Sequence, residues 1–237
     1  MSPRVRPLVD GSAKPFFLWC MHCQRLSARR YMRSTDRPFE IDCHFDRKGS
    51  ILCDKCSVNS EACDSVATGM LGNGWDYSQI LRWVTSFWDN RRDDEDEYKW
   101  PEKVRLDIAS ALKDLNSAFS KTEMVHRRAH ALTSDDPESM VTYRTFVEKR
   151  RRLLVQLSVP DEDDEEYRWE WYESSRLLRL LPGDPGYILW MVALRAFTGA
   201  IENAITSYAV LRGLGDVKKL QMVDEAFESF LVVCEEI

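Results

Sequence analysis

Six of the seven cysteines of this 237-residue chain lie within its first 63 residues, in a pattern that favours metal binding. Cys20 and Cys23 are separated by two residues, and twenty-nine residues later Cys53 and Cys56 repeat that spacing. Two intervening residues allow both thiolates to reach one ion from a tight turn, and two such pairs complete a tetrahedral shell. Thiolates favour zinc over magnesium and calcium, which prefer oxygen ligands. We therefore expect Zn²⁺, most simply one ion held by these four cysteines.

Three further side chains in the same segment widen the possible ligand set. Cys43 and Cys63 accompany the paired cysteines, and His44 directly follows Cys43. Two zinc ions would require all six cysteines of the segment, whereas Cys43 or His44 could instead replace one ligand of a single site. The sequence leaves these alternatives open.

Part of this pattern resembles that of the fungal binuclear zinc-cluster proteins, in which six cysteines hold two zinc ions. The matching spacing is Cys53-x2-Cys56-x6-Cys63, and the arginines after Cys23 resemble that family's basic first half. The resemblance covers residues 20–63, and it departs from the family at the third cysteine, because Cys43 lies much farther from Cys23 than the family pattern has it. It implies a DNA-binding transcription regulator with basic side chains near the phosphates. The arginines concerned are Arg25, Arg29, Arg30 and Arg33.

Charge is distributed unevenly along the chain, although the net charge of −6 argues against a generally basic surface for nucleic acid. Residues 1–63 carry eleven Lys and Arg against seven Asp and Glu, a balance of +4. Residues 64–237 carry twenty-two against thirty-two, a balance of −10. Contact with a polyanion is therefore expected near the N-terminus. The short basic cluster 149–152 is a second candidate, typical of segments that bind nuclear import receptors or polyanions.

No convincing catalytic constellation accompanies the cysteines, so we expect a non-enzymatic protein. His126 and His130 are four residues apart, but Arg127 stands where a zinc protease has its glutamate base. We expect both histidines to face solvent. The segment Trp19–Cys23 also resembles a thioredoxin motif, yet that chemistry belongs at the end of a strand, and helical patterns dominate the remainder of the chain.

Hydrophobic periodicity predicts a mainly α fold, with a small cysteine-rich zinc module before an all-α bundle of about six or seven helices. The expected parts are a flexible arm (1–15), a zinc-binding module (16–68) of short strands or knuckles, and a helical domain (76–237). Glycines at 69, 72 and 74 predict the loop between the last two parts. Expected helices begin at 76, 101, 121, 136, 160 and 184. Glycines at 213 and 215 end the helix from 184, and a last helix then carries an apolar seam from Leu220 to Cys234. The helix from 184 is apolar nearly all round, which predicts the central buried helix of the bundle.

The opening segment MSPRVRPLVDGSAKP lacks the apolar core of a signal peptide, and the longest apolar run, 187–194, is too short for a membrane helix. We therefore expect an intracellular protein of the nucleus or cytoplasm, without membrane contact. The leading hypothesis is a zinc-stabilised regulatory protein whose N-terminal module contacts nucleic acid while the helical domain binds a partner or self-associates. The alternative is a protein–protein interaction adaptor in which zinc is purely structural.

Overall fold

The computed structural model describes residues 19–32, 38–44, 53–61, 63–91, 98–132, 137–157, 177–228 and 230. These ranges contain seven α-helices, one 3-10 turn, η1 (Thr68–Met70), and no strand beyond an isolated bridge between Arg91 and Tyr98. The predicted mainly α fold is confirmed. The helices are α1 (Met21–Arg30), α2 (Asp54–Val58), α3 (Leu71–Asp89), α4 (Glu102–Ala129), α5 (Pro137–Leu157), α7 (Tyr187–Leu211) and α8 (Asp216–Phe227).

Some sequence predictions lie outside the described residues. They are the arm 1–15, the helix expected from 160 with its acidic run, and the end of the last expected helix at Cys234. Within the described residues, α8 ends at Phe227, and Phe230 beyond it is buried.

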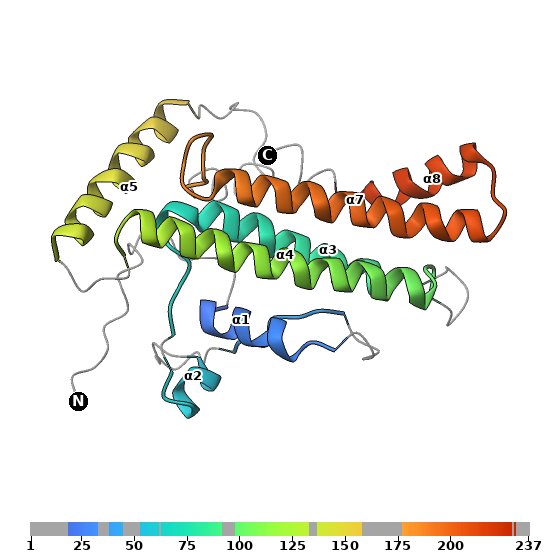
Figure 1. Ribbon diagram of the computed structural model, residues 1–237, viewed down its shortest axis with the longest axis horizontal. Coiled ribbons are helices and arrows are strands. Elements are labelled where there is room, and N and C mark those ends of the chain that lie inside the picture. The colour runs from blue at the N-terminus through green and yellow to red at the C-terminus, as the bar shows by residue number, and fades with distance from the viewer. Residues whose placement is uncertain are drawn as a thin grey trace, which may run out of the picture.

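Helix α4 lies at the centre of the molecule, between α1 on one side and α3 and α7 on the other (Figure 1). The ring of Phe119 on α4 stacks on Tyr77 of α3 and meets Trp190 of α7 edge-on. Trp19, which directly precedes the first cysteine, contacts the same Phe119 ring edge-on. The apolar stripe expected on this helix is buried as predicted, and comprises Val104, Ile108, Leu112, Leu115 and Phe119.

The cysteine-rich segment and the helical bundle share one hydrophobic core. A buried polar bridge joins α1 to α4, because Gln24 Nε2 donates to the Asn116 carbonyl at 2.7 Å and Asn116 Nδ2 donates to the Gln24 carbonyl at 3.1 Å. Tyr77 of α3 donates its hydroxyl to Asn116 Oδ1 at 2.7 Å. Most polar atoms of this buried network therefore have hydrogen-bond partners. These directional bonds determine the register of α1 along α4, in addition to the apolar contacts between the two helices.

Two predicted helix boundaries are wrong. Helix α3 begins at Leu71, so the three glycines expected in a loop lie in η1 and in the first turn of α3. The two helices expected over 101–119 and 121–132 are one continuous helix, α4. Residues 120–122 contain neither glycine nor proline, so nothing there interrupts the helical hydrogen bonds.

The prediction that the apolar helix from 184 is the central buried helix is also wrong. Helix α7 packs one face on α4, burying Trp190, Phe197 and Ile201, among others. Its opposite face is open, with Ile188 75% and Val210 58% exposed. Length and composition alone would allow α7 to cross a membrane, but the core helices of soluble proteins pass the same test.

Residues 177–180 pack closely against the start of α3, and this contact requires a glycine. The Gly72 N–H donates to the Leu178 carbonyl at 2.8 Å, and Arg179 forms a two-pronged ion pair with Asp76 of α3. A Cβ atom at Gly72 would lie 2.4 Å from Arg179 Cγ and 2.9 Å from the Leu177 carbonyl oxygen. Such contacts are too short, so the approach of the two segments depends on the missing side chain.

Gly72→Ala is expected to lower the free energy of unfolding by about 1–3 kcal/mol, because the added methyl group overpacks this contact. Urea denaturation of the full chain measures the change. The control is Gly215→Ser at the N-cap of α8, where a Cβ meets nothing within 4 Å and serine is a favoured cap. Equal stability of Gly72→Ala and the parent chain would contradict the prediction.

Candidate metal centre

Each pair of cysteines is presented by the N-terminus of a helix. Cys20 is the N-cap of α1, and its sulfur accepts the N–H of Cys23 at 3.4 Å. Cys53 is the N-cap of α2, and its sulfur accepts the N–H of Cys56 at the same distance, 3.4 Å. Because the unpaired N–H groups of a helix N-terminus carry partial positive charge, both turns favour thiolates.

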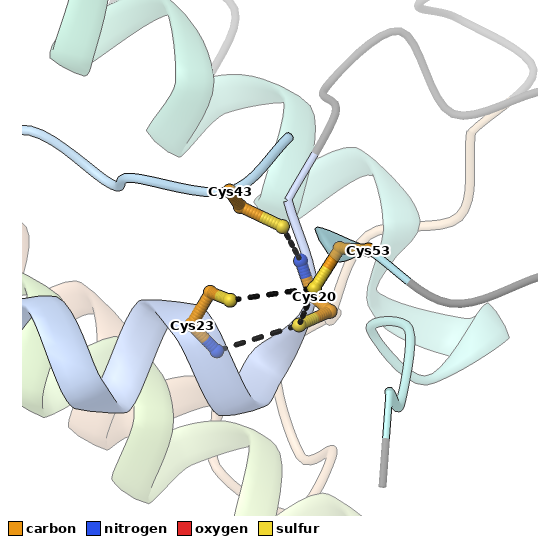
Figure 2. A group of neighbouring side chains, drawn as sticks. All are labelled: Cys20, Cys23, Cys43 and Cys53. Atoms are coloured by element: carbon orange, nitrogen blue, oxygen red, sulfur yellow. Dashed lines mark hydrogen bonds between the residues drawn. The ribbon is translucent and has the colours of Figure 1, made fainter. Parts of the chain in front are cut away.

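All six cysteines of the segment are buried. Figure 2 shows four of them, Cys20, Cys23, Cys43 and Cys53, with their side chains gathered at one point. The Sγ atoms of Cys23 and Cys53 are 3.5 Å apart, and Cys20 Sγ lies 3.8 Å from Cys53 Sγ. Cys20 Sγ also lies 3.6 Å from Cys56 Sγ. With metal–sulfur bonds of ~2.3 Å, a tetrahedron has sulfur–sulfur edges of about 3.8 Å. The observed spacings fit such a shell, whereas a disulfide would require ~2.0 Å.

The sulfur atoms form two groups of four that share two members, and within each group all four atoms lie within 4.8 Å of one another. Either group could hold a metal ion. Cys23 and Cys56, which a single-zinc site would place in one shell, belong to different groups. The first group is Cys20, Cys23, Cys43 and Cys53, and the second is Cys20, Cys53, Cys56 and Cys63.

The two groups are built alike around their shared members. The Cys20 N–H donates to Cys43 Sγ at 3.3 Å, and the Cys53 N–H donates to Cys63 Sγ at 3.3 Å. Cys20 and Cys53 are thus each the N-cap of one helix. The backbone N–H of each also binds the sulfur of one further cysteine, Cys43 in the first group and Cys63 in the second. This arrangement explains how Cys43 joins the site despite the nineteen residues that separate it from Cys23.

The protonation of these thiols depends strongly on their neighbours. A hydrogen bond from the Cys43 side chain lowers the pKa of Cys20 to about 4. Burial, with the negative charge of Cys20 close by, raises the pKa of Cys23 to about 12. The hydrogen bond to Cys20 raises the pKa of Cys43, and burial raises that of Cys56. A bound cation would supply the positive charge that further thiolates need.

The remaining predicted site residues lie outside both groups. His44 has an exposed side chain whose Nε2 is 3.1 Å from Asp42. Arg25 is half-buried on α1, whereas Arg29 and Arg30 are exposed in its last turn. Arg33 lies outside the described residues.

Three residues that support the centre carry no sequence signal that would identify them. Gln24 meets Asn116 across 92 residues of chain, and no local pattern relates the two. Asp64 accepts the Met21 N–H through its backbone carbonyl at 2.8 Å, a bond that any residue at this position could form.

No family model matches this chain, and no curated protein or solved structure matches it either. The resemblance to the fungal binuclear zinc-cluster proteins stays a prediction from the spacing of the cysteines.

The prediction that His126 and His130 face solvent is wrong. His126 is fully buried, with Nε2 2.9 Å from the hydroxyl of Tyr143, which also accepts the Gly69 N–H at 2.8 Å. His130 is half-buried, with its ring 4.5 Å from that of His126. Neither histidine belongs to a group of potential metal ligands among the described residues. Burial, followed by the charges of His130 and Arg127, lowers the pKa of His126 to about 3.

The buried His126 should make stability depend on pH. Its pKa falls from an ordinary 6.5 to about 3 on folding, so the unfolded chain binds more protons between these values. Stability is therefore fully present above 6.5 and is lost as the pH falls. Between pH 7 and pH 5 the loss should reach about 2 kcal/mol.

Urea denaturation at both pH values, for the parent chain and for His126→Gln, tests this prediction. The variant cannot titrate, so its stability should change less between the two pH values, while Glu123, Arg127 and His130 around the site remain in place. An equal pH dependence in both proteins would show that another group is responsible.

Proposed function

We propose that the six buried cysteines hold two zinc ions in one binuclear cluster, with Cys20 and Cys53 bridging the ions. The observation that carries this proposal is the membership of these two sulfurs in both groups of four. Cys23 and Cys43 would complete the first shell, and Cys56 and Cys63 the second. Shared thiolates let six cysteines satisfy two tetrahedral ions, with less buried negative charge per ion than two separate sites would carry.

The chemistry of the ligands supports zinc and a structural role. Every proposed ligand is a sulfur, which selects zinc over the harder divalent ions. All six proposed ligands are buried cysteines, which would fill all four positions of each shell. Closed shells of this kind stabilise structure, whereas catalytic zinc sites keep one position open. Binding of zinc would order a segment whose own apolar residues are few.

We further propose that this cluster presents α1 to nucleic acid in a regulatory protein. Helix α1 begins at a bridging cysteine, so the cluster would determine its position, and its last turn carries the exposed Arg29 and Arg30. Half-buried Arg25 lies on the same helix. Guanidinium groups suit phosphate oxygens, and the resemblance in cysteine spacing favours DNA over RNA.

One observation favours the alternative of an adaptor with purely structural zinc. Helix α1 buries Met21, Gln24 and Ala28, with its polar bridge to α4, so only its outer side is available to a ligand. In either case we propose that the helical domain binds a partner or self-associates.

The binuclear proposal predicts two zinc ions per chain in native mass spectrometry of the full protein. Cys43→Ser and Cys63→Ser each remove a ligand of one group only, so each variant should retain one ion. Cys234→Ser, outside the proposed cluster, should retain two and serves as the matched control. A parent protein that binds a single ion would leave only a mononuclear site, and a parent without zinc would end the proposal.

Replacing Arg25, Arg29 and Arg30 together by alanine should weaken binding of double-stranded DNA by roughly tenfold or more at low salt. The slope of log Kd against the logarithm of the salt concentration should also become smaller, by an amount that corresponds to the loss of up to about three phosphate contacts. The control removes three exposed charges outside α1 and outside the basic cluster 149–152, through Arg82→Ala, Lys121→Ala and Lys218→Ala.

The zinc content of both triple variants should equal that of the parent chain. Equal losses of DNA affinity in the two triple variants would indicate a general charge effect, since each variant removes three cations. DNA binding unchanged by the α1 substitutions, or absent from the parent protein, would favour the adaptor.

A further inference from the structure

The outer face of α7 has a regular pattern that its packing on α4 does not use. Successive residues of this face are three or four positions apart, as in the seam of a two-helix coiled coil. Apolar side chains occupy the ends, where Ile188 is 75%, Val192 57% and Val210 58% exposed. The seam consists of Ile188, Val192, Arg195, Gly199, Glu202, Thr206 and Val210.

This seam is close to symmetric about Gly199. Ile188 and Val210 are each eleven residues from Gly199, and Val192 and Thr206 are each seven residues from it. The charges are opposite, with Arg195 four residues before the centre and Glu202 three residues after it. A second copy of α7 laid antiparallel, with a two-fold axis at Gly199, therefore brings apolar ends together and places Arg195 beside Glu202 of the other copy.

The centre of the seam suits close approach of a second helix. A Cβ atom at Gly199 would meet nothing within 4 Å, so the space beside the backbone is open. The hydroxyl of Thr206 already donates to the Glu202 carbonyl at 2.8 Å, so it needs no further partner. Seven helical residues span ~10.5 Å, which is too far for Arg195 and Glu202 to pair directly within one helix. Neither residue forms an ion pair with another part of the described chain.

We propose that the outer face of α7 is a self-association surface, on which two copies of this chain pack antiparallel around Gly199. A two-fold dimer requires a self-complementary patch, and this face supplies one in both shape and charge. The proposal names the partner that the proposed function leaves open for the helical domain. It rests only on the part of the proposed function that concerns the helical domain, and it does not depend on zinc or nucleic acid.

The same face fits a membrane less well. An arginine and a glutamate occupy the middle of the apolar seam, and ionised side chains are costly in the hydrocarbon region of a bilayer. Against a second copy the same two charges complement each other. The opposite face of α7 is already committed to α4, so insertion would also break the core around Trp190.

A charge exchange tests the proposal on the full zinc-loaded chain, with mass measured by light scattering after size exclusion and by sedimentation. The parent should be a dimer at micromolar concentrations. Arg195→Glu and Glu202→Arg should each weaken dimerisation roughly tenfold or more, because like charges then face each other. The double variant, Arg195→Glu with Glu202→Arg, should recover the dimer, a result that a merely structural role would not give.

Val141→Glu on α5 is the matched control, since Val141 is an apolar residue, 60% exposed, on a different helix from the seam, and this variant should remain dimeric. Zinc content and near-ultraviolet circular dichroism, measured on every sample, separate loss of the interface from loss of the cluster or of the fold. A monomeric parent at about 100 μM, or a double variant as monomeric as the single ones, would overturn the proposal. Flotation of the parent chain with neutral vesicles, to which the basic N-terminal region has no charge attraction, would overturn it too and indicate that the apolar face binds a membrane.

Discussion

The structure depends on the burial of six sulfur atoms in a space where few of them can be ionised together. Hydrogen bonds make the Cys20 thiolate favourable, and burial, together with that nearby charge, holds the pKa of Cys23 far above its usual value. Without a cation, only a few thiols of such a cluster can be ionised at once, because each added thiolate repels the others in a medium that screens charge poorly. The need for positive charge at this point links the local turns of α1 and α2 to the proposed metal.

The consequences of the cluster extend into the bundle through α1. Gln24 is one residue beyond Cys23, and its bridge to Asn116 ties the register of α1 to that of the central helix. Trp19, one residue before Cys20, packs against Phe119 on the same helix. Any ion that orders the cysteines therefore also orders a surface of α4, so metal binding and packing of the bundle should form one cooperative unit.

The sequence predicted what depends on local spacing, and it failed where partners are remote. Two residues between cysteines determine a turn, and the steps along Val104–Phe119 determine which face of a helix is buried, so both expectations agree with the structure. The burial of His126 depends on Tyr143 of another helix, and the role of Gly72 depends on a segment about one hundred residues away, so neither could be inferred locally. Cys43 joins the group of sulfur atoms through a long connection from Cys23. The length of that connection alone suggested a departure from the pattern of the fungal binuclear zinc-cluster proteins.

Helix α7 shows why hydropathy alone misplaces an element. A helix that is apolar nearly all round has two opposite faces to bury, and a position in the interior of a bundle is only one way of burying both. Within a single chain, α7 covers one face with α4 and leaves the other exposed, an arrangement costly in water for residues such as Ile188 and Val210. A second copy against that face would satisfy the same pattern without moving the helix. The sequence expectation of a buried α7 would then be correct for the assembly, although it is wrong for the isolated chain.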